Sequence, residues 1–551
     1  MIKYIHECDS LALEEATYCV IGSGAAGITI AVELARAGKH VLMVEAGDWK
    51  DDQKLDDAYN GQVTPPHPQT TEYRRQRFGG TTHLWGGRCV PLDEQDMEYR
   101  PHVPHSGWPI SFKELSHYYP LAMEYCDAGN ADFELTALGK DTDPMFHELP
   151  LLFPDIYERI ERYSLPTDFA KKFRNEISNS SLTTVLLRAR CTSLNTNKDG
   201  SRIESITLSD GINQWQIRDK IFILCGGGLE TTRLLLMARQ QCSAWHRLDA
   251  TLGRFYSCHF DLIFGELRFK DELPHFDFEK TCDNVYARRK LQFSADYQIN
   301  NRLLNSAFRL HFPPYGDPSH GSGVLSFIYL AKSILAREYQ DILDHGAKLT
   351  TKKHNTLLHL KNVAVRFPSV IRFGYEWLFK IKLAKRKIPY TLVPNSNGSY
   401  PLEFNSEQIP SPHNRVELLS QRDSYNMPRI AVHWQMTDAD IESGIKSIEC
   451  IQSALNKTEH CQFVFDSNLL REKMRKALPI GGHHLGSTRM GYSTNDSVVN
   501  PNCQVHGVEN LYIASSSVFP TSGHANPTLT IVALAIRLVD HLKSLSGDTT
   551  I

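Results

Sequence analysis

The stretch that most constrains the fold of this chain is "YCVIGSGAAGITIAVELARAGKHVLMVEAG", residues 18–47. The short apolar run from Tyr18 to Ile21 is typical of a buried parallel strand. Gly22, Gly24 and Gly27 follow it with GxGxxG spacing, where a helix is expected to begin. The pattern predicts a strand–helix–strand unit that binds a dinucleotide.

Each glycine has a separate expected role. Gly22 permits the tight turn, Gly24 lets a pyrophosphate approach the backbone, and Gly27 lets the helix pack closely on the strand. The helix N-terminus offers free N–H groups and a positive dipole end to the phosphates. Glu45 ends the second strand, where a carboxylate accepts hydrogen bonds from ribose hydroxyls and repels a 2′-phosphate. A glycine-rich packing turn is the alternative, and the motif leaves FAD and NAD both open.

Length and composition set wider bounds. A chain of 551 residues is long enough for more than one domain. Its net charge of -3 gives no support for nucleic-acid binding, which needs a concentrated basic surface. No apolar run approaches the ~18 residues that a membrane-spanning helix needs, so we expect no transmembrane helix.

Cysteine spacing and the N-terminus indicate a compartment. The twelve cysteines fall singly, without CxxC pairs, so we expect no zinc, iron–sulfur or other metal site. The N-terminus shows no secretory signal. Both features favour a reducing cytoplasm, although export together with a partner subunit stays open.

Two further glycine clusters extend the pattern. In "RFGGTTHLWGG", residues 77–87, paired glycines bracket a segment that can run close to a flat ligand. In "KIFILCGGGLETTRLLLMA", residues 220–238, a buried strand, a glycine turn and a helix start follow one another. This second stretch predicts another strand of the nucleotide-binding sheet, far along the chain from the first two.

Together with "GGHHLGSTRMG" and "HANPTLTIVALA" near the C-terminus, these motifs resemble the glucose–methanol–choline (GMC) family of flavin oxidoreductases. The resemblance implies FAD as the cofactor. It also implies an α/β plus α+β fold, in which a doubly wound, Rossmann-like FAD domain is interleaved with a substrate domain on an antiparallel sheet. In motif the chain is closest to the branch of bacterial sugar dehydrogenases and pyranose oxidases, because Ser515 stands where many members have Asp.

The implied division of the chain has five segments. Residues 1–104, 185–266 and 478–551 are assigned to the FAD domain, the last of them carrying active-site residues. Residues 105–184 and 267–477 are assigned to the substrate domain.

The resemblance carries over a set of FAD-contacting positions: Gly22, Gly24, Gly27, Glu45, Gly79, Gly80, Thr81, Gly86, Gly87, Cys191, Gly226, Ser515, Pro527 and Thr528. Some members attach FAD covalently through a histidine whose position falls at Leu84 here. His83 is one residue early, so we expect FAD to be bound without a covalent link and His83 to line the flavin cleft.

The catalytic pair is assigned by the same alignment. His483 is expected to take the hydroxyl proton of an alcohol, because an imidazole titrates near neutrality. Asn526 is expected to hold the substrate oxygen. Pro527 suits the first turn of the closing helix, expected from Leu529 to Leu542. His484 and His524 are the competing candidates for the base.

The middle of the chain is less informative. "SAFRLHF" and "RIAVHWQM" alternate polar and apolar residues, as strands with one solvated or substrate-facing side do. Glu407 and Gln408 are candidate substrate contacts, and hydrogen bonding within a turn around Pro410 is the equal alternative.

Residues 366–387, "RFPSVIRFGYEWLFKIKLAKRK", hold seven basic residues against one acid. Val370, Phe373, Trp377 and Ile381 recur at helical spacing. The commoner explanation is a surface helix with a solvated basic face that covers the core. A peripheral contact with a membrane or with an electron-accepting partner is the alternative.

The sequence therefore predicts an FAD-dependent enzyme that oxidises a CH–OH group, with a sugar, glycoside or polyol as the expected substrate. Oxygen, a quinone and an electron-transfer protein are the possible acceptors. Two alternatives remain at this point. One is a flavin-containing lyase of the same family, and the other is a redox subunit that delivers electrons to a membrane or cytochrome partner.

Overall fold

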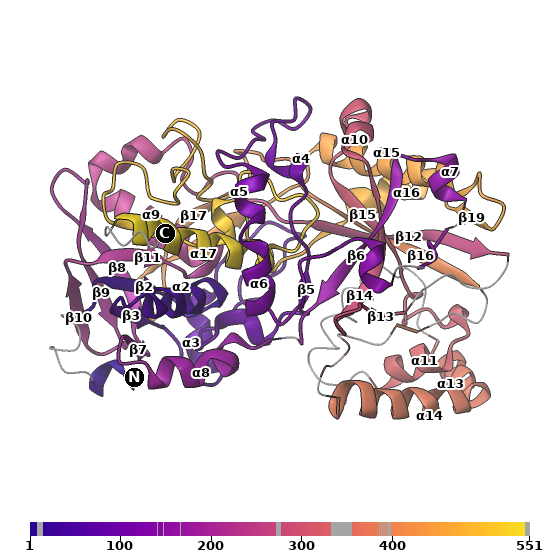
Figure 1. Ribbon diagram of the computed structural model, residues 1–551, viewed down its shortest axis with the longest axis horizontal. Coiled ribbons are helices and arrows are strands. Elements are labelled where there is room, and N and C mark those ends of the chain that lie inside the picture. The colour runs from indigo at the N-terminus through magenta and orange to yellow at the C-terminus, as the bar shows by residue number, and fades with distance from the viewer. Residues whose placement is uncertain are drawn as a thin grey trace.

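Two large sheets lie side by side along the long axis of the molecule (Figure 1). The computed structural model describes residues 1–551 except 8–14, 140–141, 147, 166, 271–276, 332–354, 385, 387, 389–391, 394–397 and 546–551. The predicted mixed fold, with a doubly wound parallel sheet and a separate antiparallel sheet, is confirmed.

The first sheet is parallel and has six strands. Their spatial order is β1 (Ile2–Tyr4), β7 (Thr183–Leu187), β3 (Val41–Val44), β2 (Tyr18–Ile21), β11 (Ile221–Leu224) and β21 (Leu511–Ile513). Strand β11 pairs with β2, so the late strand does join the nucleotide-binding sheet as predicted. Strand β21 adds the C-terminal part of the chain to the same sheet.

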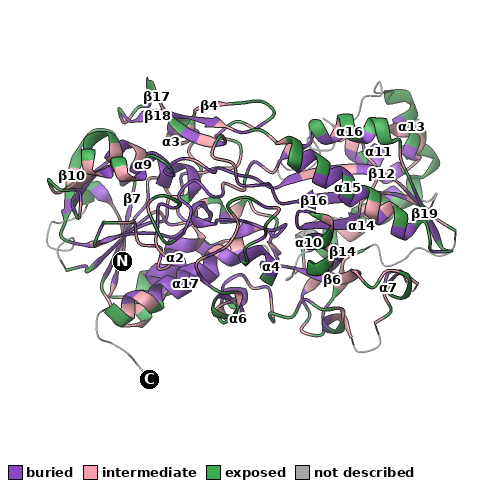
Figure 2. Ribbon diagram, turned by 90° about the horizontal axis from the view of Figure 1, so that it is seen from above, coloured by how far each residue is buried: buried purple, intermediate pink, exposed green. Residues whose placement is uncertain are grey.

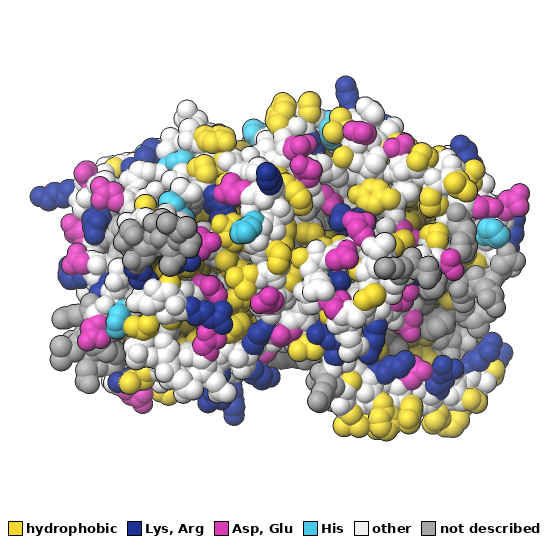
Figure 3. Space-filling model, viewed as in Figure 1, with side chains coloured by type: hydrophobic (Ala, Val, Ile, Leu, Met, Phe, Trp, Pro, Cys, Tyr) yellow, Lys and Arg dark blue, Asp and Glu magenta, His cyan; other side chains and the backbone are white. Residues whose placement is uncertain are grey.

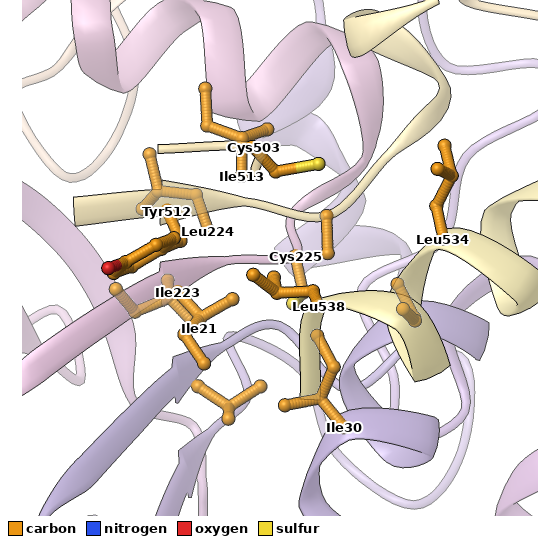
Figure 4. Packing of buried hydrophobic residues seen from close by; sticks show 14 of the residues in the cluster. Ile21, Ile30, Ile223, Leu224, Cys225, Cys503, Tyr512, Ile513, Leu534 and Leu538 are labelled. Carbon is orange, nitrogen blue, oxygen red and sulfur yellow. The ribbon is translucent and has the colours of Figure 1, made fainter. Parts of the chain in front are cut away.

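Apolar side chains on both faces explain why this sheet is parallel and buried. Helices α2 (Ala25–Arg36) and α17 (Pro527–Leu545) pack against each other and cover one face. Figure 4 shows Ile30 of α2 and Leu538 of α17 next to strand residues such as Ile21 and Leu224. This buried cluster holds the first and last parts of the chain together (Figure 2).

The second sheet is antiparallel. Its strand order is β19 (Cys461–Val464), β12 (Phe260–Phe269), β16 (Ser399–Ser406), β15 (Ser306–Leu310), β14 (Tyr286–Phe293), β6 (Ile156–Tyr163) and β5 (Arg88–Cys89). Strands β13 (Glu279–Lys280) and β20 (Leu478–Pro479) pair with β14 and β12. The strand expected at "SAFRLHF" is β15.

Alternation along these strands gives the sheet two different faces. Phe260 and Phe404 belong to the apolar cluster under helices α15 (Asp438–Leu455) and α16 (Ser467–Arg475). Their neighbours Asp261 and Glu403 point to the opposite face and line a cavity between the two sheets. One face therefore builds a core, and the other presents charge to the cavity.

Smaller elements complete the fold. A three-stranded sheet contains β17 (Arg415–Arg422), β18 (Pro428–His433) and β4 (Gln62–Val63), and the strand expected at "RIAVHWQM" is β18. Another contains β8 (Arg190–Thr196), β9 (Ile203–Ser209) and β10 (Gln214–Arg218), and α9 (Gly227–Gln241) packs on β8. This part of the fold also contains the helices α3 (Gln53–Asp56), α4 (Glu94–Met97), α5 (Phe112–Ser116), α6 (Tyr119–Tyr125), α7 (Leu149–Leu152), α8 (Phe169–Asn179) and α10 (Ala295–Asn301).

A helical unit projects at the lower right of Figure 1. It consists of α11 (Gly323–Leu330), α13 (Thr356–Val365), α14 (Phe367–Glu376) and the π-helical stretch η7 (Trp377–Lys382). It contains most of the basic segment 366–387, but Lys385 and Lys387 lie outside the described residues, as do the side chains of Ile381 and Lys382. Within the described residues, no helix combines the length and apolar character needed to cross a membrane.

The five-segment division remains a prediction. Strand β7 spans the proposed boundary at 184/185 and pairs in the parallel sheet. Strand β12 spans the boundary at 266/267 and pairs in the antiparallel sheet. Strand β5, residues 88–89, lies within the segment assigned to the FAD domain but also pairs in the antiparallel sheet.

Close packing at the start of α2 gives a stability prediction. A Cβ on Gly27 would overlap the carbonyl oxygen of Gly22, whereas a Cβ on Gly374 of α14 would meet nothing within 4 Å. Gly27→Ala should therefore lower the free energy of unfolding by about 1–3 kcal/mol, as overpacking does. Gly374→Ala should leave it unchanged or raise it by up to ~1 kcal/mol through helix propensity. Denaturant unfolding of both variants measures the difference, and equal stability would contradict the close contact at Gly27.

Candidate active site

A cavity of about 1800 Å³ lies between the two sheets. The parallel-sheet side contributes the start of α2 and segments 80–88, 226–230 and 526–528. The antiparallel-sheet side contributes Asp261, Ile263, His311 and Glu403. Pockets for one small ligand usually measure ~300–1,000 Å³, so this cavity has room for a large cofactor together with a substrate.

The N-terminus of α2 forms one end of the cavity. Gly24 is its N-cap, no side chain caps the helix, and its first turn carries no acid. The first N–H groups of a helix have no partner within it, so they point at whatever lies in front of them. A Cβ on Gly24 would enter open space within the cavity, while Gly80 lies directly against the Gly24 Cα. This cradle fits a pyrophosphate, and a side chain on Gly24 would enter the space that the pyrophosphate is expected to take.

The other two glycines of the motif serve packing. Gly22 has φ +105° and lies against the carbonyl of Cys225 at the end of β11. Gly27 lies against the carbonyl oxygen of Gly22. These contacts let the backbones of β2, α2 and β11 pack directly against one another, and this packing holds the cradle in place.

Glu45 lies at the end of β3 and lines the cavity. Its Oε2 accepts hydrogen bonds from the Ser23 N–H (3.0 Å) and the Ser23 hydroxyl (2.6 Å), and its Oε1 accepts one from the Gly47 N–H (2.8 Å). Burial raises the pKa of Glu45, while these three hydrogen bonds oppose that shift. Because a carboxylate accepts about four hydrogen bonds, one position stays available to a ribose hydroxyl.

Most of the predicted FAD-contacting residues line the cavity, and two do not. The cavity is lined by Gly22, Gly24, Glu45, Gly80, Thr81, Gly86, Gly87, Cys191, Gly226, Ser515, Pro527 and Thr528. Gly27 and Gly79 do not line it. Gly79 is the left-handed N-cap of the 3₁₀ turn Gly80–His83, and a Cβ there would meet Ala170 of α8.

His83 also lines the cavity. Its Nδ1 lies 2.8 Å from the carbonyl oxygen of Gly80, and its Nε2 lies 3.3 Å from a carboxylate oxygen of Asp51. Leu84 is exposed at the same rim.

The centre of the site is a pair of histidine rings. His259 Nε2 lies 2.8 Å from the carbonyl oxygen of Gly523, and His259 Nδ1 lies 2.8 Å from His483 Nδ1. A carbonyl only accepts, so His259 must donate from Nε2. Neutral His259 then accepts at Nδ1, and His483 donates from its own Nδ1. The Nε2 atom of His483 is left without a proton.

That Nε2 atom lies 3.2 Å from the amide nitrogen of Asn526, and both residues line the cavity. Burial lowers the pKa of His483 well below 6.5, with His259, Arg88 and His484 acting in the same direction. Burial also lowers the pKa of His259 to about 4. Both rings are therefore neutral near pH 7.

The structure separates the other histidine candidates. His484 lines the cavity, with its ring stacked against Tyr256, and its main chain packs against Gly228. His524 is buried away from the cavity lining, and its Nε2 accepts a hydrogen bond from the Lys290 ammonium.

Glu407 and Gln408 are not brought to the cavity either. Glu407 forms a buried, two-pronged ion pair with Arg100. Gln408 binds the Cys258 N–H, the Trp434 indole and the Gln435 carbonyl. Both side chains hold segments of the fold together.

Sequence reasoning missed His259 and the charged cavity face. His259 precedes β12 and lies 224 positions from His483, in a stretch without a family motif. Arg88 lies 3.5 Å from Glu161 and 3.6 Å from Glu403. Burial and the neighbouring Glu403 raise the pKa of Asp261 to about 6. Strand alternation in "HFDLIFGELRF" was the signal for Asp261.

Comparisons with known proteins agree with this geometry. A family model described as FAD binding domain matches residues 18–51, and one described as GMC oxidoreductase matches residues 410–535. The chain is 24% identical to 2-methyl-1,2-propanediol dehydrogenase of Mycolicibacterium austroafricanum, over 97% of this chain and 96% of that protein. It is 35% identical to C-glycoside 3-oxidase of Arthrobacter globiformis, over 21% of each chain.

A solved structure shares the fold. An FAD-dependent oxidoreductase from Chaetomium thermophilum superposes with a TM-score of 0.55 at 14% identity, over 97% of this chain and 100% of that one. The two matched segments contain the phosphate cradle and the His483–Asn526 pair. The chain therefore contains an FAD-binding domain segment and the C-terminal domain of the GMC oxidoreductases.

Proposed function

We propose that this FAD-dependent oxidoreductase oxidises a CH–OH group of a hydroxyl-rich small molecule, namely a sugar, glycoside or polyol. The observation that carries the proposal is the unprotonated Nε2 of His483, which the Gly523–His259 hydrogen bonds hold toward the cavity beside Asn526. A base and a hydrogen-bond donor on one substrate oxygen are the groups that alcohol oxidation needs.

In this mechanism His483 Nε2 accepts the hydroxyl proton. The Asn526 amide donates a hydrogen bond to the same oxygen and stabilises its developing negative charge. His259 accepts from His483 Nδ1 throughout, and this hydrogen bond strengthens as the His483 ring becomes positively charged. FAD, when bound, supplies the acceptor for the hydride that leaves the carbon.

The cavity wall supports the substrate class. Arg88, Asp261, His311 and Glu403 line the cavity, so a ligand there meets several charged or polar groups. Tyr315 and Phe312 line it too and provide flat apolar surfaces. This mixture suits a ring or chain that carries several hydroxyls. The two relatives named above act on a diol and a glycoside, as their names state.

Anaerobic reduction of the bound flavin tests the proposal. Sugars, glycosides and polyols should bleach the absorbance of the purified yellow protein under nitrogen, and simple apolar alcohols should not. Admission of air then shows whether oxygen is the acceptor, and quinones or an electron-transfer protein are tried next. A flavin that no alcohol bleaches would contradict the proposal and favour the lyase alternative.

In the same assay, His483→Ala should retain FAD, but its rate of flavin reduction should fall by about 10²-fold or more, which is the usual contribution of a general base. An unchanged rate in the variant would remove His483 from this role.

The pH dependence of the wild-type rate gives a second test of His483. Because the pKa of His483 is lowered in the folded protein, its basic form persists to acidic pH. The wild-type rate should therefore stay constant from alkaline pH down through 6.5 and fall only below it.

We propose His259 as a positioning residue for the base. His259→Ala should lower kcat about 10-fold or more with little change in KM, because His483 is no longer held in the productive tautomer. His259→Asn should restore part of kcat, since its side-chain oxygen can accept from His483 Nδ1. Equal loss in both variants, or a change confined to KM, would indicate a structural role instead.

We further propose that FAD is bound without a covalent link. Leu84 occupies the position of the family's attachment histidine, and His83 Nδ1 is engaged by the Gly80 carbonyl. Acid precipitation should therefore release the yellow flavin into the supernatant. A pellet that stays yellow after washing would refute this assignment.

A further inference from the structure

Helix α13 has its polar side turned inward. Its one fully buried side chain is His359, whose Nδ1 lies 3.0 Å from the Ser326 hydroxyl of α11 and whose ring stacks on Tyr329 at 4.1 Å. Its large apolar side chains face outward: Leu357 is 77% exposed and Val365 is 66% exposed. An ordinary surface helix has the opposite arrangement.

Helix α14 is apolar on two faces. Val370 is buried, and Phe373 packs against the buried cluster that contains Val324 and Leu325 of α11, as the helical spacing predicted. Phe367, Ile371 and Tyr375 lie on a second stripe at intervals of four residues, and they are 55–63% exposed. The stripe continues through Leu378 and Phe379, where the Tyr375 and Phe379 rings lie 4.4 Å apart.

These side chains form a concentrated patch. Ten of the 22 exposed large hydrophobic residues in the described part of the chain lie between residues 357 and 383. We call them the α13–α14 apolar face: Leu357, Leu358, Leu360, Val365, Phe367, Ile371, Tyr375, Leu378, Phe379 and Leu383. Figure 3 shows apolar side chains gathered along the lower right edge of the molecule, where these helices lie.

Basic side chains border this face. Lys361, Arg366, Arg372 and Lys380 are exposed on the same helices. Between residues 355 and 380 the sequence has one acid, Glu376, and it already pairs with Arg372 and Lys380. In Figure 3 a row of Lys and Arg side chains lies directly above the apolar edge. An apolar strip with a basic border matches the acyl and headgroup layers of an anionic bilayer.

We propose that the α13–α14 apolar face docks on the surface of an anionic phospholipid bilayer. The apolar side chains enter the boundary between acyl chains and headgroups, and the basic residues bind lipid phosphates. The helices lie in the membrane plane, since no described helix is long and apolar enough to cross it. The proposal adopts the alternative that the sequence analysis gave for this segment, peripheral contact with a membrane, over the commoner explanation of a surface helix with a solvated basic face.

The helical unit that carries the α13–α14 apolar face adjoins the active-site cavity. Phe312 and Tyr315, just before α11, line the cavity, and so does Ile388, just after the basic segment. Tyr315 also packs with Val324 and Leu325 of α11. The helical unit that would dock is therefore continuous with one wall of the cavity.

Vesicle flotation of the flavin-loaded protein tests this proposal. The wild type should float with vesicles of mixed phosphatidylglycerol and phosphatidylcholine at low ionic strength, and less so at high salt. Phe367→Asp combined with Ile371→Asp should weaken binding at least about tenfold, because two inserted apolar side chains are lost. Neutralising Lys361 and Lys380 to Gln should weaken it about fivefold for each charge removed.

Ile212→Asp is the matched control. Ile212 is 90% exposed in the turn between β9 and β10, so this change adds one acidic side chain, half of what the double variant adds, at an exposed apolar site outside the patch. The control should float like the wild type, and retained FAD shows that each variant is folded.

Three outcomes would overturn the proposal. They are wild-type protein that stays unbound, equal binding of all variants, and a dimer in size-exclusion chromatography that the Phe367/Ile371 variant splits without any vesicle binding. The last result would assign the face to a second copy of the chain. None of these outcomes depends on the chemistry assigned to His483.

Discussion

The packing of α17 on α2 is the contact on which the site depends. Leu534 and Leu538 of α17 lie with Ile30 of α2 in one buried cluster (Figure 4). This apolar contact joins segments about 500 residues apart and brings the start of α17 to the cavity that the start of α2 also lines. Asn526 immediately precedes α17, so helix packing brings it to the position where its amide contacts His483.

Within that frame, one backbone carbonyl sets the chemistry. The Gly523 carbonyl fixes the tautomer of His259, which in turn fixes that of His483. Gly523 lies three residues before Asn526. In the proposed mechanism, the loop that leads into α17 therefore supplies the donor to the substrate oxygen, and it also supplies the acceptor that determines which His483 nitrogen is basic. Burial keeps both rings neutral, because charging either one inside the protein is costly.

The sequence predicted what depends on local pattern. Strands β2, β3 and β11, the cradle glycines and the closing helix follow from apolar runs and glycine spacing, which report local geometry. His259 could not be found in this way, because its role arises from a contact across 224 positions. The outward stripe of α14 was missed for another reason. Helical periodicity shows that a helix has an apolar face, but it does not say which face is buried when both are apolar.

The charged face of the antiparallel sheet extends the argument to the substrate. Arg309 pairs with Glu161 and Glu403, and Arg88 approaches the same two carboxylates. Buried charges are tolerated only when they are paired and hydrogen-bonded, so this network fixes its side chains in place. Asp261 already accepts a hydrogen bond from Asn405, and Glu403 accepts hydrogen bonds from Arg288 and Arg309, but a carboxylate can accept about four. A ligand with several hydroxyls can donate to the remaining acceptor positions of these two cavity-lining carboxylates, whereas an apolar alcohol cannot, and this difference supports the proposed polyhydroxylated substrate independently of His483.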